Sequence, residues 1–278
     1  MVALITYLPF YRVHEVLDYF QKNIEILKPK YQLIYIDNVY SDKQVRLLQK
    51  IIPEYIEIKT GNWRSRGGTW FTMLQDLHQL STEALFVDSD NVLDLDFPEA
   101  HMEISSEPIY TVLDAEAWAN NARQFLSRSK PSNRQIKGRS VYLYKVYDAS
   151  VTAIFKGGSL FFIGPKQVVY FKKPPELELI RRVEKAFNNV AKDLRNFISD
   201  ETVLGVLVYL SGIREVPWIV ASHHYHHGST PPKAIKPLVA MAHYQFASGL
   251  AKEFNISPFL RYKIKYFISF LKNINKWK

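Results

Sequence analysis

The amino-acid sequence predicts an α/β fold in which a mostly parallel central sheet is flanked by helices. Short continuous apolar runs alternate with longer segments whose apolar residues recur every three or four positions. Polar residues follow each apolar run directly. Continuous apolar runs of strand length are typical of strands buried on both faces, as in parallel sheets. The intervening amphipathic helices are expected to cover those two faces.

These elements can be placed in order along the first 98 residues. Apolar runs predict strands at residues 2–7, 33–36, 55–58 and 85–87, and helical spacing predicts helices over residues 13–27, 42–52 and 67–80. Ligands bind to open α/β sheets at the carboxyl ends of the strands. The polar residues after each strand should therefore converge, at residues 9–12, 37–38, 62–68 and 88–90.

The rest of the chain is less regular. A polar, basic loop is predicted at residues 127–140, with strands near 140–144, 151–155 and 159–163. Helical spacing predicts one long helix over residues 175–198, with prolines that suit its first turn. A short helix opens at Asp200, and a histidine-rich loop spans residues 222–229.

The composition is that of a globular protein, with 47% hydrophobic and 23% charged residues. No segment approaches the roughly 20 apolar residues of a membrane span, and the N-terminus does not resemble a signal peptide. The absence of cysteine excludes disulfides and thiolate sites and fits a cytoplasmic protein. Of the net charge of +9, residues 251–278 carry +6, from seven Lys or Arg against Glu253. This concentration at one end argues against a surface built as a whole for nucleic acid.

Two carboxylates follow the strand at residues 85–87 directly, at Asp88 and Asp90. Ser89 between them lets the chain turn, so that both side chains can reach one hard cation. Mg²⁺ and Mn²⁺ favour such oxygen ligands and share them with substrate phosphates. Acidic turn residues are also common after strands, so this pattern alone indicates only a candidate site.

The segment ALFVDSDNVL resembles the D-x-D segment of family-2 glycosyltransferases and related enzymes of the GT-A type. LIYIDNVYSD is similar to their second-strand motif, and GNWRSRGGTWFTML to their Gly/Asn-rich loop before a helix. PFYR is similar to their Pro-x-Tyr-Asn motif, with Arg12 where Asn is frequent. The resemblance runs in order from residue 2 to 98 and returns near 157–163 and 199–212. It implies a GT-A fold, in which a single Rossmann-like nucleotide-binding half (1–98) is fused to an acceptor half (99–235).

The resemblance also implies where a nucleotide-sugar donor binds. Pro9, Tyr11 and Asp37 would contact the nucleoside, with Asp37 at the position that recognises the base. Gly157 and Gly158 would bring the backbone close to the donor sugar. The alternative for Asp37 is a helix-capping or turn residue, and the alternative for the two glycines is an ordinary tight turn.

Asp88 and Ser89 are likewise expected at the donor. Arg64 and Arg66 lie in the loop that follows the third strand. Their guanidinium groups match phosphate oxygens in geometry, so either could pair with the donor diphosphate. A solvated loop is the alternative for both.

Asp200 and Glu201 occupy the place of the family's acidic pair, before Leu204 and Gly205 in an apolar segment. The resemblance implies that one of them removes the proton of the acceptor hydroxyl, although this chain has Asp-Glu where Glu-Asp is commoner. Such a base must lie within hydrogen-bond reach of the nucleophile. The alternative is that the pair caps a helix at Ser199, which is compatible with the same role.

Four of the eight histidines lie within residues 223–227. Imidazole binds Mn²⁺ and many other divalent ions. Several GT-A enzymes complete the D-x-D coordination with a late histidine, and this cluster lies at a similar distance beyond the acidic pair. We therefore expect His226 or His227 to join Asp88 and Asp90 in binding Mn²⁺ or Mg²⁺.

Residues 236–278 are expected to form a basic, amphipathic C-terminal tail. Its last 22 residues mix aromatic and aliphatic side chains with cations and hold no acid. Such segments commonly lie on anionic membrane surfaces, and equally often dock on their own domain. Peripheral contact between this tail and a membrane is one of the two expectations.

Together these features predict a metal-dependent glycosyltransferase that transfers a sugar from a nucleotide-sugar donor to a saccharide or lipid-linked acceptor, with inversion favoured. A retaining enzyme on the same fold is an alternative. A sugar nucleotidyltransferase would favour a glycine-rich loop after the first strand, and residues 8–12 contain no glycine. A basic nucleic-acid-binding protein would require charge spread over the core, and we expect no nucleic-acid partner.

Overall fold

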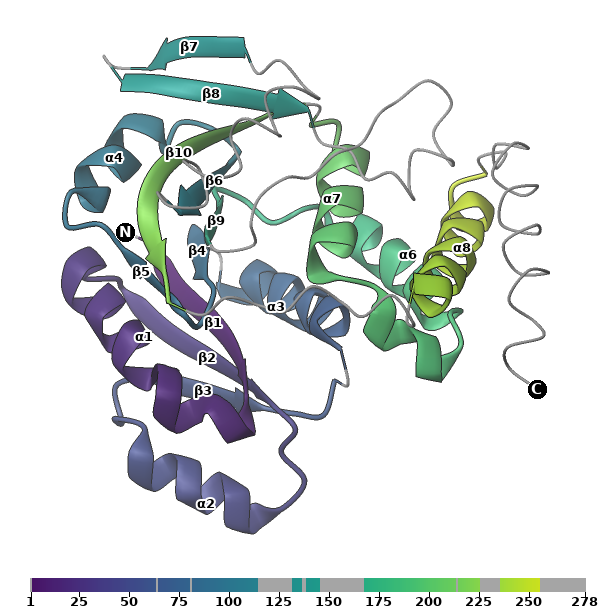
Figure 1. The fold of residues 1–278 in the computed structure, drawn as a ribbon, viewed down its shortest axis with the longest axis horizontal. Helices are drawn as coiled ribbons and strands as arrows, with labels where there is room; N and C mark the ends of the chain where they lie inside the picture. The colour runs from purple at the N-terminus through teal and green to yellow at the C-terminus, as the bar shows by residue number, and fades with distance from the viewer. Residues whose placement is uncertain are drawn as a thin grey trace.

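The computed structural model describes residues 2–63, 65–80, 82–114, 132–136, 139–145, 168–213, 215–225 and 236–255. The first half of the chain alternates strands and helices (Figure 1): β1 (Ala3–Pro9), η1 (Phe10–Arg12), α1 (Val13–Leu27), β2 (Tyr31–Asp37), α2 (Asp42–Ile51), β3 (Glu57–Thr60), α3 (Arg66–Leu80), β4 (Ala84–Val87), β5 (Asn91–Leu93), α4 (Phe97–Ile104) and β6 (Ile109–Asp114). The second half contributes β7 (Ser132–Ile136), β8 (Arg139–Lys145), β9 (Val168–Phe171), α6 (Leu177–Asn188), η2 (Lys192–Phe197), α7 (Asp200–Leu210), β10 (Glu215–His224) and α8 (Lys236–Glu253).

The described strands form one sheet in the order β3-β2-β1-β4-β9-β6-β10-β8-β7, with β5 paired to β10. β1 pairs in parallel with β2 and β4, β2 pairs in parallel with β3, and β6 with β10. Only β9, β8 and β5 among these strands run against the common direction. The predicted α/β fold with a mostly parallel central sheet is confirmed.

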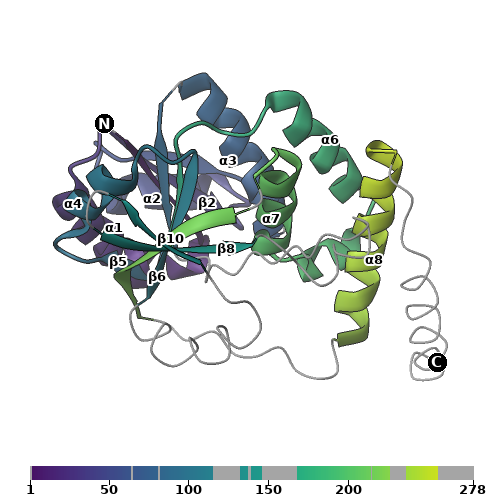
Figure 2. The same ribbon diagram turned by 90° about the horizontal axis from the view of Figure 1, so that it is seen from above.

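Helices cover both faces of this sheet (Figures 1 and 2), and the alternation of side chains along β1 shows how. Ile5 and Tyr7 belong to a core shared with α3, α6, α7 and α8. Leu4 and Leu8 belong to a second core shared with α1, α2 and α4. A strand buried on both faces is apolar at nearly every position, which is the signal that predicted it.

The helix predicted over residues 175–198 is wrong in its continuity. α6 ends at Asn188, and the chain resumes as the 3-10 helix η2. Arg195 closes this break, because its guanidinium donates to the carbonyls of Asn188 (2.6 Å) and Val190 (3.0 Å). Val190 and Leu194 are nonetheless buried. The helical spacing of apolar residues therefore continues across the turn, which is why the sequence pattern predicted one unbroken helix.

Three predicted boundaries also differ from the structure. The third strand lies at residues 57–60 and not at 55–58, and the segment predicted as a loop at 127–140 contains β7. The histidine-rich segment begins as a strand, because Ser222 to His224 pair with Leu93 to Asn91 of β5. Polar residues such as these form a strand because a partner strand distant in sequence pairs with them. The local sequence pattern carries no information about that partner. The strands predicted near 151–155 and 159–163 lie outside the described residues.

The beginning of the predicted tail, residues 236–253, forms α8, which packs on α6 (Figure 2). A methyl group added at Gly249 would lie 2.8 Å from the carbonyl oxygen of Ala186, so the two helices are in close backbone contact. Arg182 of α6 lies 4.1 Å from the ring centre of Phe254 and holds the end of α8. Within the described ranges, no helix has both the length and the apolar character to cross a bilayer.

The second core contains a polar aromatic cluster. His101 of α4 lies 2.7 Å from the hydroxyl of Tyr110 through its Nδ1, and the rings of Tyr110 and Tyr170 stack at 4.7 Å. Burial raises the pKa of both tyrosines, and burial lowers the pKa of His101. His101 is therefore neutral over more of the pH range in the folded chain than in the unfolded chain.

This lowered pKa predicts a loss of stability in mild acid. Below about pH 6.5 the unfolded chain takes up a proton at His101 before the folded chain does, so the free energy of unfolding falls by at most about 1.4 kcal/mol per pH unit. Urea unfolding at pH 7.5 and 5.5 should show this decline, and His101→Asn should remove part of it. An equal decline in both proteins would contradict the prediction.

Candidate functional site

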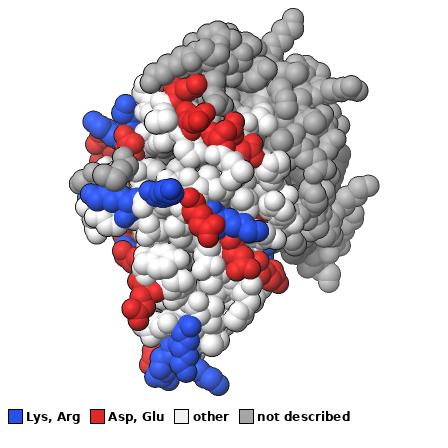
Figure 3. Space-filling view, turned by 90° about the vertical axis from the view of Figure 1, so that its left-hand side faces the viewer, with Lys and Arg blue, Asp and Glu red and all other residues white. Residues whose placement is uncertain are grey.

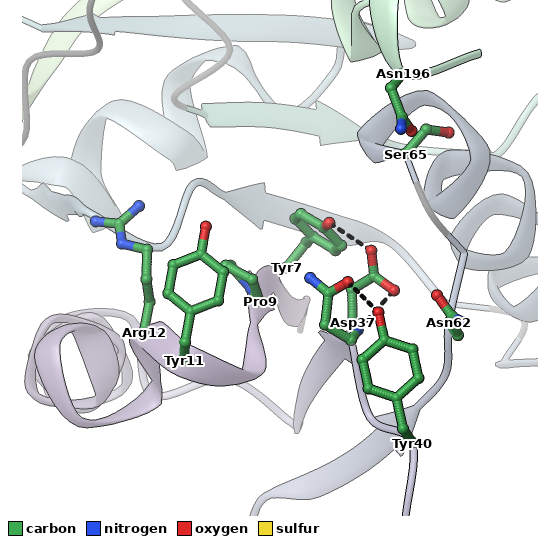
Figure 4. Close-up of a pocket in the computed structure, with 10 residues that line it drawn as sticks. Tyr7, Pro9, Tyr11, Arg12, Asp37, Tyr40, Asn62, Ser65 and Asn196 are labelled. Atoms are coloured by element: carbon green, nitrogen blue, oxygen red, sulfur yellow. Dashed lines mark hydrogen bonds between the residues drawn. The ribbon is translucent and has the colours of Figure 1, made fainter. Parts of the chain in front are cut away.

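The carboxyl ends of β1, β2 and β3 meet at a pocket of about 570 Å³, which we call the strand-end pocket (Figure 4). The parallel register places Pro9 opposite Asp37, so the residues that follow these strands are brought together. Figure 4 shows Arg12 and Tyr11 on one side of the pocket and Asp37, Tyr40 and Asn62 on the other. The pocket is lined by Tyr7, Pro9, Tyr11, Arg12, Asp37, Asn38, Tyr40, Asn62, Ser65 and Asn196.

Asp37 connects the ends of all three strands. Its Oδ2 accepts a hydrogen bond from the Tyr7 hydroxyl (3.1 Å), and its Oδ1 accepts from the backbone amides of Asn38 and Trp63 (2.8 Å each). The residue is only 2% exposed. A carboxylate has about four lone-pair positions, so these three bonds leave acceptor capacity for one further donor on the pocket side.

The rim of the pocket carries two exposed tyrosines, Tyr11 at 73% and Tyr40 at 67%. Tyr40 is held in place, because its hydroxyl donates to Asn38 Oδ1 (3.0 Å) and its amide donates to Gln44 Oε1 (2.8 Å). Asn38 has a positive φ of 62°, a conformation that asparagine tolerates better than most residues. The chain thus turns sharply after β2 and presents the Tyr40 ring over the pocket.

Residues 88–91 form a buried turn between β4 and β5, which we call the D-x-D turn. The amide of Asn91 donates to the carbonyl of Asp88 (3.0 Å), and the amide of Ser89 donates to Asp88 Oδ1 (2.9 Å). Asn23 of α1 pins the far side of this turn: its amide donates to the Asn91 carbonyl (2.7 Å) and its Oδ1 accepts from the Leu93 amide (2.8 Å). The positions of both aspartates are therefore set by the fold.

Asp90 is contacted from two distant parts of the chain. Arg12 Nη2 lies 3.2 Å from Asp90 Oδ2, and His224 Nδ1 lies 3.4 Å from Asp90 Oδ1. The amide of Tyr225 also donates to the Asp90 carbonyl (2.9 Å). The end of β10 therefore lies against the D-x-D turn, and it brings the histidine-rich segment to the aspartates.

The polar atoms around this turn fit a bound cation. In the described part of the chain, Ser89 Oγ, Asp90 Oδ1 and Asn91 Oδ1 are buried without a hydrogen-bond partner. His224 Nδ1 lies 3.4 Å from Asp90 Oδ1 and 3.3 Å from Asn91 Nδ2. Mg²⁺ and Mn²⁺ are commonly held by one or two carboxylates, with phosphate oxygens and water as further ligands. No group of three acidic or histidine side chains suited to a metal occurs among the residues described.

Asp200 opens α7 and is 7% exposed, with Ser199 as the N-cap whose Oγ accepts from the Thr202 amide (3.2 Å). The start of α7 packs on the start of α3, since a methyl group added at Gly67 would lie 3.0 Å from Val203. Asn196 in η2 and Ser65 before α3 line the same pocket. Asp200 and Glu201 therefore lie four and five positions after Asn196, which lines the strand-end pocket.

Several predicted site residues lie outside what the structure describes: Arg64, Gly157, Gly158, His226 and His227. Arg66 and Glu201 are placed as backbone in α3 and α7, and their side chains are not described. The roles predicted for these seven residues stay predictions.

Sequence reasoning missed Asn23, Tyr40 and Asn196 and gave Arg12 no role, and it assigned His224 to the loop or to phosphate and not to the aspartates. Arg12 was detectable, because it follows the first strand within the segment expected to converge. His224 lies two residues before the predicted His226, so the described end of the histidine-rich segment does reach Asp90. Asn23 and Asn196 carry no local signal, since one is an isolated asparagine in an amphipathic helix and the other is a turn residue.

Charge is mixed on the face of the molecule that carries α1, α2 and α4. Figure 3 shows Lys and Arg side chains interspersed with Asp and Glu on this face. Electrostatic attraction of a polyanion depends on clustered positive charge. This face therefore does not present a continuous basic surface.

Neither a family model nor a curated protein matches this sequence. Among solved structures, the chain is similar to the inositol-1-phosphate CTP transferase from T. maritima (10% identity, TM-score 0.43, covering 87% of this chain and 96% of that one). It is also similar to S. aureus TarS in complex with UDP (13% identity, TM-score 0.42, covering 92% of this chain and 71% of that one). A third similar structure is glucosyl-3-phosphoglycerate synthase from Mycobacterium tuberculosis, in complex with Mn²⁺, UDP and glucosyl-3-phosphoglycerate (9% identity, TM-score 0.41, covering 92% of this chain and 81% of that one).

All three similarities have TM-scores below 0.5 and identities of 13% or less. At these identities and TM-scores they assign no substrate, metal or mechanism to this chain. A function has to be inferred from the chain's own side chains.

The bonds of Asn23 generate a testable prediction. Asn23→Ala leaves the Asn91 carbonyl and the Leu93 amide without their buried partner, which should lower the free energy of unfolding by about 2–4 kcal/mol. Glu25→Ala, on the exposed side of the same helix, should change it by less than about 0.5 kcal/mol. Urea unfolding measures both, and equal stability of the two variants would show that Asn23 does not hold the turn.

Proposed function

We propose that the protein binds a nucleotide-sugar donor in the strand-end pocket and transfers its sugar to an acceptor hydroxyl. One observation carries the proposal: Arg12 lines the pocket and also pairs with Asp90. The pocket with Asp37 and the D-x-D turn with His224 are thereby parts of one site. A nucleoside at the first and a diphosphate at the second match the arrangement of a nucleotide sugar.

The nucleoside occupies the end of the pocket that holds Asp37. The remaining acceptor position of its carboxylate suits an N–H group of a base, and the bonds from Tyr7 and the two amides keep the carboxylate in place. Pro9 and Tyr11 form the opposite wall. The exposed ring of Tyr11 offers a flat apolar surface on which a base can stack.

The diphosphate lies toward the D-x-D turn. Asp88 and Asp90, with His224, His226 or His227, would hold Mn²⁺ or Mg²⁺, and this ion supplies positive charge that stabilises the diphosphate as leaving group. Arg64 and Arg66 would pair with phosphate oxygens. Gly157 and Gly158 would lie against the donor sugar.

Transfer begins when Asp200 or Glu201 accepts the proton of the acceptor hydroxyl. The freed oxygen bonds to the anomeric carbon as the bond from that carbon to the diphosphate oxygen breaks, and the configuration inverts. Most of the rate gain would come from holding nucleophile and leaving group on opposite faces of the sugar. The acceptor is a saccharide or a lipid-linked saccharide, and residues 256–278, outside the described structure, would provide contact with the membrane surface.

Donor binding is expected to depend on a divalent ion and on Asp90. In thermal shift measurements over a panel of nucleotide sugars, one donor should stabilise the protein with Mn²⁺ and not with EDTA. Asp90→Ala should weaken its binding at least about tenfold, because loss of residues that merely support a metal ligand already costs 10–100-fold. Glu99→Ala, an exposed acid on α4, should bind as the unaltered protein does. If no nucleotide sugar binds under either condition, the proposed function is wrong.

The base should be identified by amide substitution. Asp200→Asn or Glu201→Gln should lower kcat by about 100-fold or more, since a positioned base contributes 10²–10⁴-fold. Donor affinity should stay within about twofold in both variants, because neither side chain is proposed to contact the donor. Analysis of the product anomer distinguishes inversion from retention, and full activity in both variants would exclude this pair as the base.

A further inference from the structure

We propose that Arg12 is an internal cation that neutralises Asp90 while the site is empty and moves to the donor's diphosphate when a divalent ion binds Asp90. Metal and donor then bind cooperatively, with Arg12 as the element that couples them. The inference rests on the proposed function for the identity of the second ligand. Its first part, competition between Arg12 and a divalent ion, concerns Asp90 alone.

Asp90 needs a positive partner. The residue is 4% exposed, and a carboxylate removed from water is costly unless a cation or several donors compensate it. Arg12 Nη2, at 3.2 Å from Oδ2, is the permanently charged group that the described structure pairs with this carboxylate. Oδ1 lies 3.4 Å from His224 Nδ1 but accepts no hydrogen bond from any residue described, so Asp90 retains ligand capacity.

Arg12 is held loosely enough to move. Its second ion pair joins Nε to Glu15 Oε2 at 3.3 Å, and the Glu15 side chain is 65% exposed, so this bond is weakened by solvent. The Arg12 side chain already lines the strand-end pocket. Rotation about its own bonds can therefore carry the guanidinium from Asp90 toward the pocket without a change in the backbone.

Two cations cannot share Asp90 without further negative charge. A divalent ion bound to this carboxylate would lie about 2.1 Å from an oxygen, and thus within a few ångströms of the guanidinium. Like charges at such a separation repel strongly in a partly buried site. A diphosphate removes the conflict, because its oxygens accept the guanidinium and also ligate the metal. Each ligand should then raise the affinity for the other by the same factor.

The experiment titrates Mn²⁺ into the full-length protein, with free Mn²⁺ followed by electron paramagnetic resonance, first alone and then with saturating UDP or another nucleoside diphosphate. Arg12→Gln should bind Mn²⁺ alone about tenfold more tightly than the unaltered protein, within the usual range of coupling between sites. The nucleotide should then tighten Mn²⁺ binding less in Arg12→Gln than in the unaltered protein. Arg46→Gln, the same change of charge at an exposed position of α2, should leave both affinities unchanged.

Arg12→Lys provides a second variant in case Arg12→Gln does not fold. A lysine keeps the charge but cannot contact Asp90 and Glu15 with one planar group. The Mn²⁺ affinity of Arg12→Lys should therefore lie between that of the unaltered protein and that of Arg12→Gln. Adding Asp90→Asn to either variant should abolish the gain. Equal Mn²⁺ affinity of the unaltered protein and the folded Arg12 variants overturns the proposal. Failure of every nucleoside diphosphate to bind overturns the proposed function instead, because the titration with Mn²⁺ alone still decides the role of Arg12.

Discussion

The buried carboxylate of Asp90 is the constraint on which the site depends. It stands at the end of a central strand, where the fold withdraws it from water, and it must be compensated by charge from elsewhere in the chain. Arg12 comes from η1, just after β1 and 78 positions before Asp90, and His224 comes from the end of β10. Groups from the beginning and from the later part of the chain therefore meet at one buried carboxylate.

The surrounding hydrogen bonds fix geometry more than they add charge. Asn23 and Asp37 do similar work at two places, because each uses a buried polar side chain to tie backbone groups of neighbouring segments together. Buried polar groups are costly unless every member of the network is satisfied, and satisfied networks are rigid. The nucleotide proposed for this pocket would therefore meet a wall that is largely organised before it binds.

The sequence was sufficient for the features that have a local signature. Apolar runs located the central strands, and the rule that ligands bind at the carboxyl ends of strands brought residues 9–12, 37–38 and 62–65 to one pocket. The break between α6 and η2 was not predictable in this way, because burial alternates with the same spacing on both sides of it. The position of His224 beside Asp90 depends on the pairing of β10 with β5, and so on contacts between distant residues. The same holds for Arg12, whose partner is 78 positions away.

β10 pairs with β8 at its beginning, with β6 in its middle and with β5 at its end. Its pairing with β6 is irregular between Val220 and Ser222. This irregularity puts one extra residue, Ala221, on β10, and it sets the phase in which the strand reaches β5. Side chains alternate between the two sides of a strand, so loss of a single residue here would turn His224 away from the aspartates and bring a neighbour in its place. Insertions and deletions in this strand should therefore be tolerated far less than substitutions, even at positions that touch no ligand.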